Sequence, residues 1–243
     1  MMQAHWCSWT AFLAMTAAAF TGPVMGQPDL KWFQRQSVNS PSARVGHAMV
    51  FDASRGRTVL FGGLGANLHN DTWEWDGSNW IHLSPALSPP PRQMHAMAFD
   101  SSRGRTVLFG GQGTSSTLND TWEWDGANWL PCQPASVPPC RQSHAMAFDS
   151  ARGRTLLFGG IDNFLILADT WEWDGTNWVQ RQALPSPSQR FRHAMAFEAN
   201  RQRTLLFGGQ DASNLRDDTW AWDGSCWTRS EEHTSELQSP NTI

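Results

Sequence analysis

The chain of 243 residues contains no tyrosine, a single lysine (Lys31) and only 4 cysteines. Its longest apolar run, Trp9–Phe20, is shorter than the about 20 residues that a membrane-spanning helix needs, so no membrane span is expected. The net charge of −4 gives no indication of nucleic-acid binding. Because the chain also lacks a Gly-rich phosphate loop, a His-Glu-x-x-His motif and a nucleophile elbow, the sequence predicts no cofactor and no metal.

Both ends are expected to lie outside the folded domain. Small and polar residues follow the apolar run, and Val24-Met25-Gly26 resembles a cleavage site. We therefore expect residues 1–26 to be a signal peptide and the protein to be secreted or periplasmic; the alternative is a disordered or buried N-terminal helix. Residues 229–243 resemble, over their first part, the translation of a DNA-sequencing adapter. We expect this tail to be artefactual and disordered, and the natural sequence to differ after residue 228.

The main feature of the sequence is a repeat. The segment RQMHAMAFDSSRGRTVLFGG returns three times with few changes, and each copy is followed by Asp-Thr-Trp, Trp-Asp-Gly and a closing Trp. Its histidines are spaced by 48, 49 and 49 residues: His47, His95, His144 and His193. A fixed period of this length indicates an array of one supersecondary unit.

Each repeat contains four short extended segments. The first two resemble His-Ala-Met-Ala-Phe and Arg-Thr-Val-Leu-Phe, the third is Thr-Trp-Glu-Trp or a close variant, and the fourth carries the closing Trp. Gly-containing turns separate them, with Asp-Gly read as a two-residue hairpin signal. Four antiparallel strands in about 50 residues are typical of a propeller blade. The predicted blades are 44–83, 92–132, 141–181 and 190–228.

The combination of Arg-x-x-His, an apolar strand, Gly-Gly and spaced tryptophans resembles the kelch repeat, which also builds the propeller of galactose-oxidase-like proteins. The resemblance implies an all-β fold over residues 27–228. Trp32 occupies the position of a closing Trp with no repeat before it, so we expect one orphan N-terminal strand beside four complete blades. Because kelch propellers usually have six or seven blades, an incomplete ring is predicted, with at least one further blade in the natural protein.

The repeated arginines are the predicted ligand-binding residues: Arg44, Arg92, Arg141 and Arg190. A ring of guanidiniums at a channel mouth could bind carboxylates. Alternatively, each could pair with Glu74, Glu123, Glu172 or an Asp of another blade, because buried charges need partners. The histidines are expected to hydrogen-bond a neighbouring blade rather than to share a metal, since neighbouring blades lie about 10 Å apart.

Two further features concern the tryptophans and the cysteines. The repeated tryptophans are expected to pack between blades rather than to stack on sugars, and Asp-Gly differs from the sialidase Asp-box in having no residue between Asp and Gly. Cys132 and Cys140 flank a Pro-rich connection and are predicted to form a disulfide. Cys226 has no predicted partner within the chain.

Functional variation is expected in the loops after Gly-Gly and before each Arg, because these differ between repeats whose strands agree. Within them, 164–167 (Phe-Leu-Ile-Leu) is either a contact patch or a segment folded over the blade edge. We therefore expect a secreted binding or scaffold module for a protein or carbohydrate ligand. The alternative is a mutarotase-like or copper-oxidase-like enzyme whose decisive residues lie outside this chain; the absence of Tyr excludes the copper-radical chemistry from the residues present.

Overall fold

The computed structural model describes residues 34–35 and 37–230. The predicted signal peptide, the strand expected around Trp32 and most of the predicted tail lie outside these residues. The last described strand ends at Arg229, one residue beyond the expected domain boundary.

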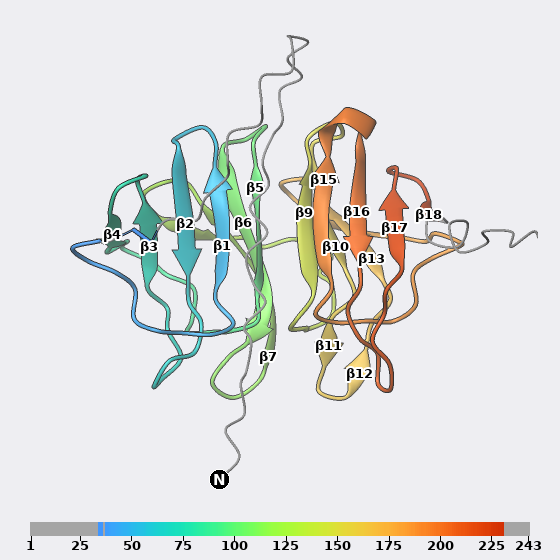
Figure 1. The fold of residues 1–243 in the computed structure, drawn as a ribbon, viewed down its shortest axis with the longest axis horizontal. Helices are drawn as coiled ribbons and strands as arrows, with labels where there is room; N and C mark the ends of the chain where they lie inside the picture. The colour runs from blue at the N-terminus through green and yellow to red at the C-terminus, as the bar shows by residue number, and fades with distance from the viewer. Residues whose placement is uncertain (1–33, 36, 231–243) are drawn as a thin grey trace, which may run out of the picture.

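Four antiparallel four-stranded sheets confirm the predicted kelch-type architecture (Figure 1). Blade 1 contains β1 (Ala48–Asp52), β2 (Arg57–Phe61), β3 (Thr72–Trp75) and β4 (Trp80–Leu83). Blade 2 contains β5 (Ala96–Asp100), β6 (Arg105–Gln112), β7 (Thr117–Trp124) and β8 (Trp129–Pro131). Blade 3 contains β9 (Ala145–Asp149), β10 (Arg154–Phe158), β13 (Thr170–Trp173) and β14 (Trp178–Arg181), with a separate hairpin of β11 (Ile161–Asp162) and β12 (Leu165–Ile166). Blade 4 contains β15 (Ala194–Glu198), the 3-10 turn η1 (Ala199–Arg201), β16 (Arg203–Phe207), β17 (Thr219–Trp222) and β18 (Trp227–Arg229).

The turns between the strands of a blade form at residues that adopt left-handed backbone angles or whose side chains accept hydrogen bonds from backbone amides. Gly104, between β5 and β6, has φ +64°, a left-handed conformation that suits glycine. The Asp-Gly turn is longer than the predicted two residues, because β3 and β4 already pair at Trp75 and Trp80. The carboxylate of Asp76 instead accepts hydrogen bonds from the backbone of Ser78 and Asn79, both at 2.8 Å, and holds a four-residue turn.

Successive blades pack face to face through the tryptophans, as predicted. Phe61 of blade 1 lies edge-on to Trp129 of blade 2, with ring centroids 5.1 Å apart. Between blades 2 and 3, Phe109 meets Trp178 in the same way at 5.2 Å. These side chains are fully buried, so the repeated aromatic positions form the hydrophobic core between blades rather than a sugar-binding surface.

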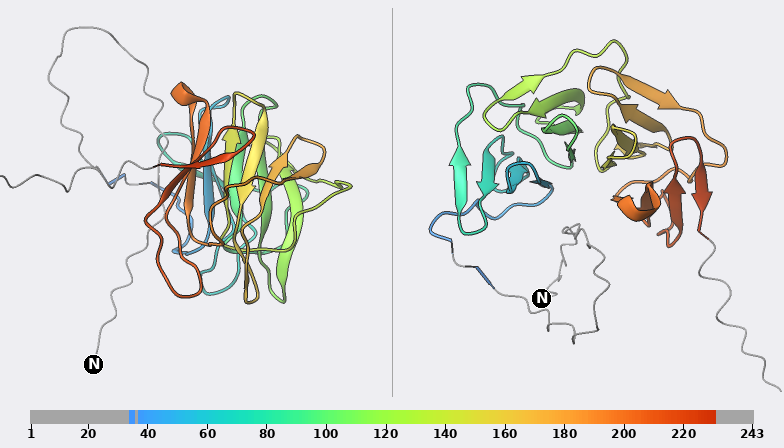
Figure 2. Two further views of the ribbon diagram at one scale, coloured as in Figure 1. Left: turned by 90° about the vertical axis from the view of Figure 1, so that its right-hand side faces the viewer. Right: turned by 90° about the horizontal axis from the view of Figure 1, so that it is seen from above.

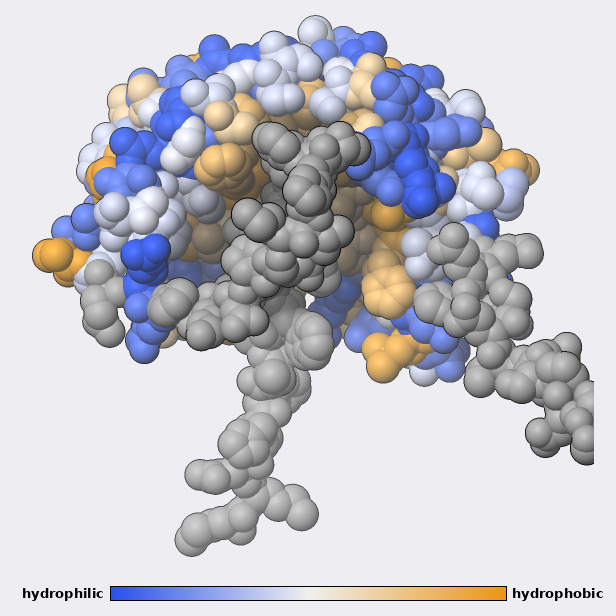
Figure 3. All heavy atoms as spheres, turned by 45° about the horizontal axis from the view of Figure 1, so that its top comes forward, coloured by the Kyte–Doolittle hydropathy of each residue, from blue (hydrophilic) through white to orange (hydrophobic). Residues whose placement is uncertain are grey.

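The four blades form an arc around a central axis and do not close into a ring (Figure 2). In the space-filling view, hydrophilic residues predominate on the outer rim, and hydrophobic residues gather toward the inner side of the arc (Figure 3). The two outermost blades each have one sheet face that no described blade covers. Met49 and Phe51 of β1 are accordingly exposed, whereas the equivalent Met97 and Phe99 of β5 are buried.

Candidate functional site: the variable-loop face

Both families of variable loop lie at the same end of the arc. The start of β1 pairs with the end of β2, at Ala48 and Phe61, and every blade has this antiparallel register. The loop after Gly-Gly and the connection that enters the next first strand therefore emerge side by side. In Figure 1 this end is at the bottom, where the β11–β12 hairpin projects. We call it the variable-loop face.

The predicted ligand-binding arginines are anchored below this face. The guanidinium of Arg141 donates to both carboxylate oxygens of Asp169 at 2.7 Å and to the carbonyl oxygen of Gly159 at 2.9 Å. Although burial alone would raise it, the hydrogen bonds and charge of Arg141 hold the pKa of Asp169 below its usual value. The same pairing joins Arg44 to Asp71, Arg92 to Asp120 and Arg190 to Asp218.

This geometry corrects the expectation of a ligand-facing arginine ring. Arg92, Arg141 and Arg190 are 0 % exposed, so their guanidiniums are not available to a ligand. The structural alternative is realised, but with a different partner: the Asp of Asp-Thr-Trp in the same blade, rather than a Glu or an Asp of another blade. Asp169 lies 28 residues after Arg141 in the sequence. The same spacing recurs in blades 2 and 4, and it was the one signal in the sequence that pointed to this partner.

The arginine backbone ties each blade to the preceding one. Arg141 donates its backbone N–H to Leu118 O at 3.1 Å, and its carbonyl accepts from Gly111 N at 2.9 Å. The arginine thus joins two blades, because its backbone binds the preceding blade and its side chain binds its own blade. This arrangement fixes the base of the neighbouring loops.

A chain of backbone hydrogen bonds follows the inner rim of the variable-loop face. Met94 N donates to Gly46 O at 2.7 Å, Ser143 N to Met94 O at 2.8 Å, and Arg192 N to Ser143 O at 2.8 Å. Met94, Ser143 and Arg192 have φ angles of +56° to +58°, which non-glycine residues rarely adopt. Each blade is therefore coupled to the next by a backbone hydrogen bond beside the axis.

The histidines lie between blades, directly above this rim. His95 lies edge-on to Phe61 of the preceding blade, with ring centroids 5.6 Å apart. In the same way, His144 lies against Phe109 and His193 against Phe158. Burial, together with the positive charge of Arg92, lowers the pKa of His95 to about 3. These imidazoles are neutral packing groups. Within residues 34–35 and 37–230, no three His, Cys, Asp or Glu side chains converge to hold a metal.

The β11–β12 hairpin is the most distinctive part of the variable-loop face. Its strands pair Ile161 with Ile166 and Asp162 with Leu165 around the two-residue turn Asn163-Phe164. Asn163 adopts φ +51°, and its side-chain amide donates to Asp162 Oδ1 at 3.2 Å. Ile166 is buried, while Phe164 is 98 % exposed and Leu165 is 65 % exposed. The segment is thus a projecting apolar tip and does not fold over the blade edge.

The predicted disulfide between Cys132 and Cys140 does not form in the structure, in which both are free thiols. Cys132 packs against the core between blades 2 and 3, and burial raises its pKa to about 12. The Cys140 thiol is directed elsewhere and donates to Asp162 Oδ2 at 3.2 Å. Burial and this carboxylate raise the pKa of Cys140, so both sulfurs are held as poor nucleophiles.

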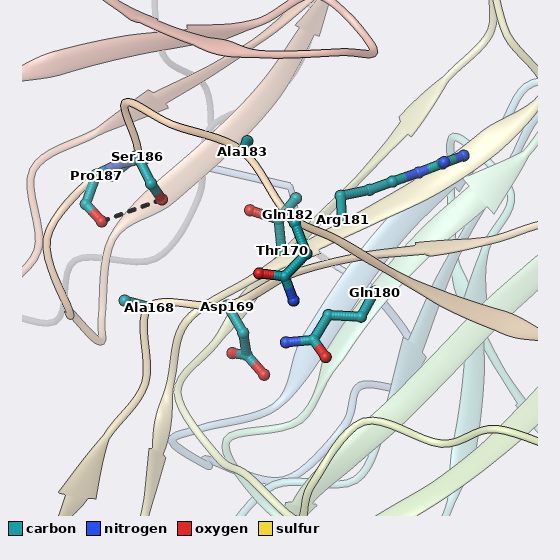
Figure 4. Close-up of a pocket in the computed structure, with 9 residues that line it drawn as sticks. All are labelled: Ala168, Asp169, Thr170, Gln180, Arg181, Gln182, Ala183, Ser186 and Pro187. Carbon is teal, nitrogen blue, oxygen red and sulfur yellow. Dashed lines mark hydrogen bonds between the residues drawn. The ribbon is translucent and has the colours of Figure 1, made fainter.

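A shallow pocket of about 340 Å³ lies beside the connection from blade 3 to blade 4. Figure 4 shows Asp169, Gln180 and Gln182 directed toward it and Arg181 pointing away. The Asp169 carboxylate already accepts from Arg141 and from Trp171 Nε1, so the polar groups left in the pocket include the two amides and the Ser186 hydroxyl. The pocket offers hydrogen bonding and contains no paired acid and base.

Fold and geometry together define a kelch-type β-propeller arc with a variable-loop face. The model of the KLHDC2/KLHL20/DRC7 Kelch-repeats domain matches residues 27–179, more than half of the chain. The chain therefore belongs to this kelch-repeat family, whose propellers are protein-binding scaffold modules. No curated protein was found to match the chain. Among the described residues, no helix has the length and apolar character needed to cross a membrane.

Proposed function

We propose that this protein is a binding module that recognises a protein partner through the variable-loop face, with the tip Phe164-Leu165 as its anchor. The observation that carries this proposal is the nearly complete exposure of Phe164 on a hydrogen-bonded hairpin. A large aromatic side chain that is held in water by its own turn gains most by entering an apolar pocket of another protein.

The hairpin is supported well enough to present this side chain in a fixed position. Leu167 N donates to Gly160 O at 2.9 Å at the base of the hairpin, and Ile166 is buried beneath it. Few rotatable bonds must be ordered when a partner binds, which lowers the entropic cost of association. The corresponding loops of the other blades carry mainly polar side chains and fit the polar rim of such an interface.

The proposal also includes where the protein acts and the chemical class of its ligand. The apolar run Trp9–Phe20 and the small residues after it support a secreted or periplasmic protein. A protein partner is favoured over a carbohydrate because the exposed tip presents one aromatic and one aliphatic side chain side by side in the sequence.

The test uses the purified chain against a displayed library of random peptides and, separately, an array of glycans. Peptides selected by the chain should lose at least about tenfold in affinity when Phe164→Ser and Leu165→Ser are combined, as expected for a central anchor. Val179→Ser is the matched control, because Val179 is an exposed apolar residue on β14. Equal losses in both variants, or selection of glycans alone, would contradict the proposal.

A further inference from the structure

Two of the three connections between described blades are held by a side chain of the blade that follows. In the connection from blade 1 to blade 2, Ala86 N donates to Asn128 Oδ1 at 3.2 Å. In the connection from blade 2 to blade 3, Ala135 N donates to Asn177 Oδ1 at 2.7 Å. Each asparagine follows its alanine by 42 residues, so this hydrogen bond is a repeated feature, here called the connection pin.

The connection from blade 3 to blade 4 lacks the pin. Leu184 occupies the position of the two alanines, and Cys226 follows it at the same spacing of 42 residues, where the other blades have asparagine. The turn itself is unchanged, because Cys226 N donates to Asp223 Oδ1 as Asn177 N donates to Asp174 Oδ1. The thiol is directed to Asp223 Oδ2 at 3.3 Å, so it binds its own turn instead of the connection.

The two ends of this connection are fixed. At its start, Arg181 pairs with Thr170 in the sheet of blade 3. At its end, the carbonyl oxygen of Ser188 accepts from Arg190 Nε at 3.0 Å, and the equivalent arginines make the same bond at the other two junctions. Any freedom of the connection is therefore confined to its middle.

The middle of the connection, residues 184–186, is here called the crest. On either side of it, Ala183 packs against the core between blades 3 and 4, and Pro187 is buried. Among the described residues, Leu184 N has no hydrogen-bond acceptor, and Leu184 is 93 % exposed. The Ser186 hydroxyl donates to Pro187 O, which belongs to the connection itself (Figure 4). The crest is thus hydrogen-bonded to neither blade.

The crest borders the shallow pocket of about 340 Å³ beside this connection. Ala183, Ser186 and Pro187 line the pocket from the connection, and Asp169 and Gln180 line it from blade 3 (Figure 4). A displacement of the crest therefore changes the width of the pocket, while the strands of blade 3 keep their hydrogen bonds.

We propose that the crest is a movable wall that widens and narrows this pocket, and that it is released because Cys226 replaces the asparagine of the connection pin. A hydrogen bond of ordinary strength changes the equilibrium between a held and a released segment by about fivefold. Segments with few apolar contacts and without backbone hydrogen bonds are the ones that open locally in a folded protein. This device lies in the connection and is distinct from the hairpin tip at Phe164 and Leu165.

The test compares the amide hydrogen exchange of Leu184 and Ala135 in the full chain, residue by residue by NMR, after correction for the intrinsic rates of the two sequences. Leu184 should exchange at least about fivefold faster, because Ala135 N has an acceptor among the described residues and Leu184 N has none. Cys226→Asn should slow Leu184 to the rate of Ala135, and Asn177→Cys should accelerate Ala135 by about the same factor. Backbone relaxation of Ser186 should show motion that Cys226→Asn removes.

Cys226→Ser is the matched control, because a hydroxyl can bind Asp223 as the thiol does but provides no amide oxygen. Leu184 should exchange as fast in this variant as in the unsubstituted chain. Circular dichroism verifies that the variants fold, and the Asn177→Cys comparison does not depend on a change at Cys226. A chain with Phe164→Ser and Leu165→Ser should keep the fast exchange of Leu184, so failure of the proposed function remains distinguishable.

Three results would overturn the proposal. The first is equal exchange of Leu184 and Ala135 in the unsubstituted chain. The second is a rate of Leu184 that Cys226→Asn leaves unchanged, or that Cys226→Ser lowers as much as Cys226→Asn. The third is relaxation of Ser186 that stays the same when Cys226→Asn slows Leu184, because the wall of the pocket would then not move with the crest.

Discussion

Lowering the pH from 7 to 4.5 should strongly destabilise this protein through the histidines between its blades. Burial and the nearby arginines lower the pKa of His95 and His193 to about 3, and that of His144 well below its usual value. In the unfolded chain a histidine titrates near 6.5, so below this pH the unfolded state binds protons that the folded state does not. The stabilisation is complete above pH 6.5 and is lost as the pH falls toward the folded pKa.

The magnitude follows from the number of histidines. Each histidine with a folded pKa below this window contributes about 1.4 kcal/mol per pH unit, so His95 and His193 together remove about 5 kcal/mol between pH 6.5 and 4.5, and His144 adds to this loss. This is comparable with the about 5–15 kcal/mol that stabilises a typical domain. Asp120 and Asp169, whose pKa values their arginines lower, add little in this window, because an aspartate of the unfolded chain takes up its proton mainly below about pH 4.5.

The assay is urea unfolding followed by tryptophan fluorescence at several pH values. The free energy of unfolding should fall as the pH is lowered, with a slope equivalent to at least about two protons, and His95→Gln should reduce the slope by about one proton. Val179→Ser is the control, since Val179 lies exposed on β14 and carries no titratable group. A slope below one proton in the unsubstituted chain would refute the account of these histidines.

Three further predictions concern stability and use the same unfolding assay. Arg141→Ala should cost about 3–5 kcal/mol because it leaves a carboxylate without its partner, and a loss below about 1 kcal/mol would contradict this role. Phe109→Ala should cost about 3–5 kcal/mol, whereas the half-exposed Phe207→Ala should cost much less, and equal losses would be inconsistent with the open face of blade 4. A Cβ at Gly104 would meet no other atom, so Gly104→Ala should cost only roughly 1–2 kcal/mol of backbone strain. Gly111→Ala should cost more, because its Cβ would lie 2.7 Å from a backbone oxygen. Equal costs of the two substitutions would count against the close approach at Gly-Gly.

The blades could be predicted from the sequence because the repeat appears four times in register. Four short extended segments in each copy predicted four strands per blade, and the structure confirms four antiparallel four-stranded sheets. The partner of each arginine was missed, although Asp169 follows Arg141 by 28 residues, as the equivalent aspartates do in blades 2 and 4, and the spacing in blade 1 is 27 residues. Charge pairing alone could not select that aspartate, because Glu172 is equally acidic and only three residues away.

Two other features depend on details that the repeat does not encode. Cys132 and Cys140 lie close in sequence, but one thiol packs into the core and the other turns to Asp162, so proximity alone was misleading. The exposure of Phe164 depends on the two-residue turn that begins at Asn163, which occurs in one blade only. Unique loops have no second copy from which their structure can be inferred, and the candidate binding site consists of such loops.

The most direct test of the binding account is hydrogen exchange of the full chain with and without a peptide selected by it. Backbone amides of residues 161–167 and of the adjoining variable loops should exchange more slowly when the peptide is bound, while the turns at the opposite end, such as 52–57 and 76–79, should be unaffected. Protection confined to those opposite turns, with no change at residues 161–167, would contradict the assignment of the variable-loop face as the binding surface.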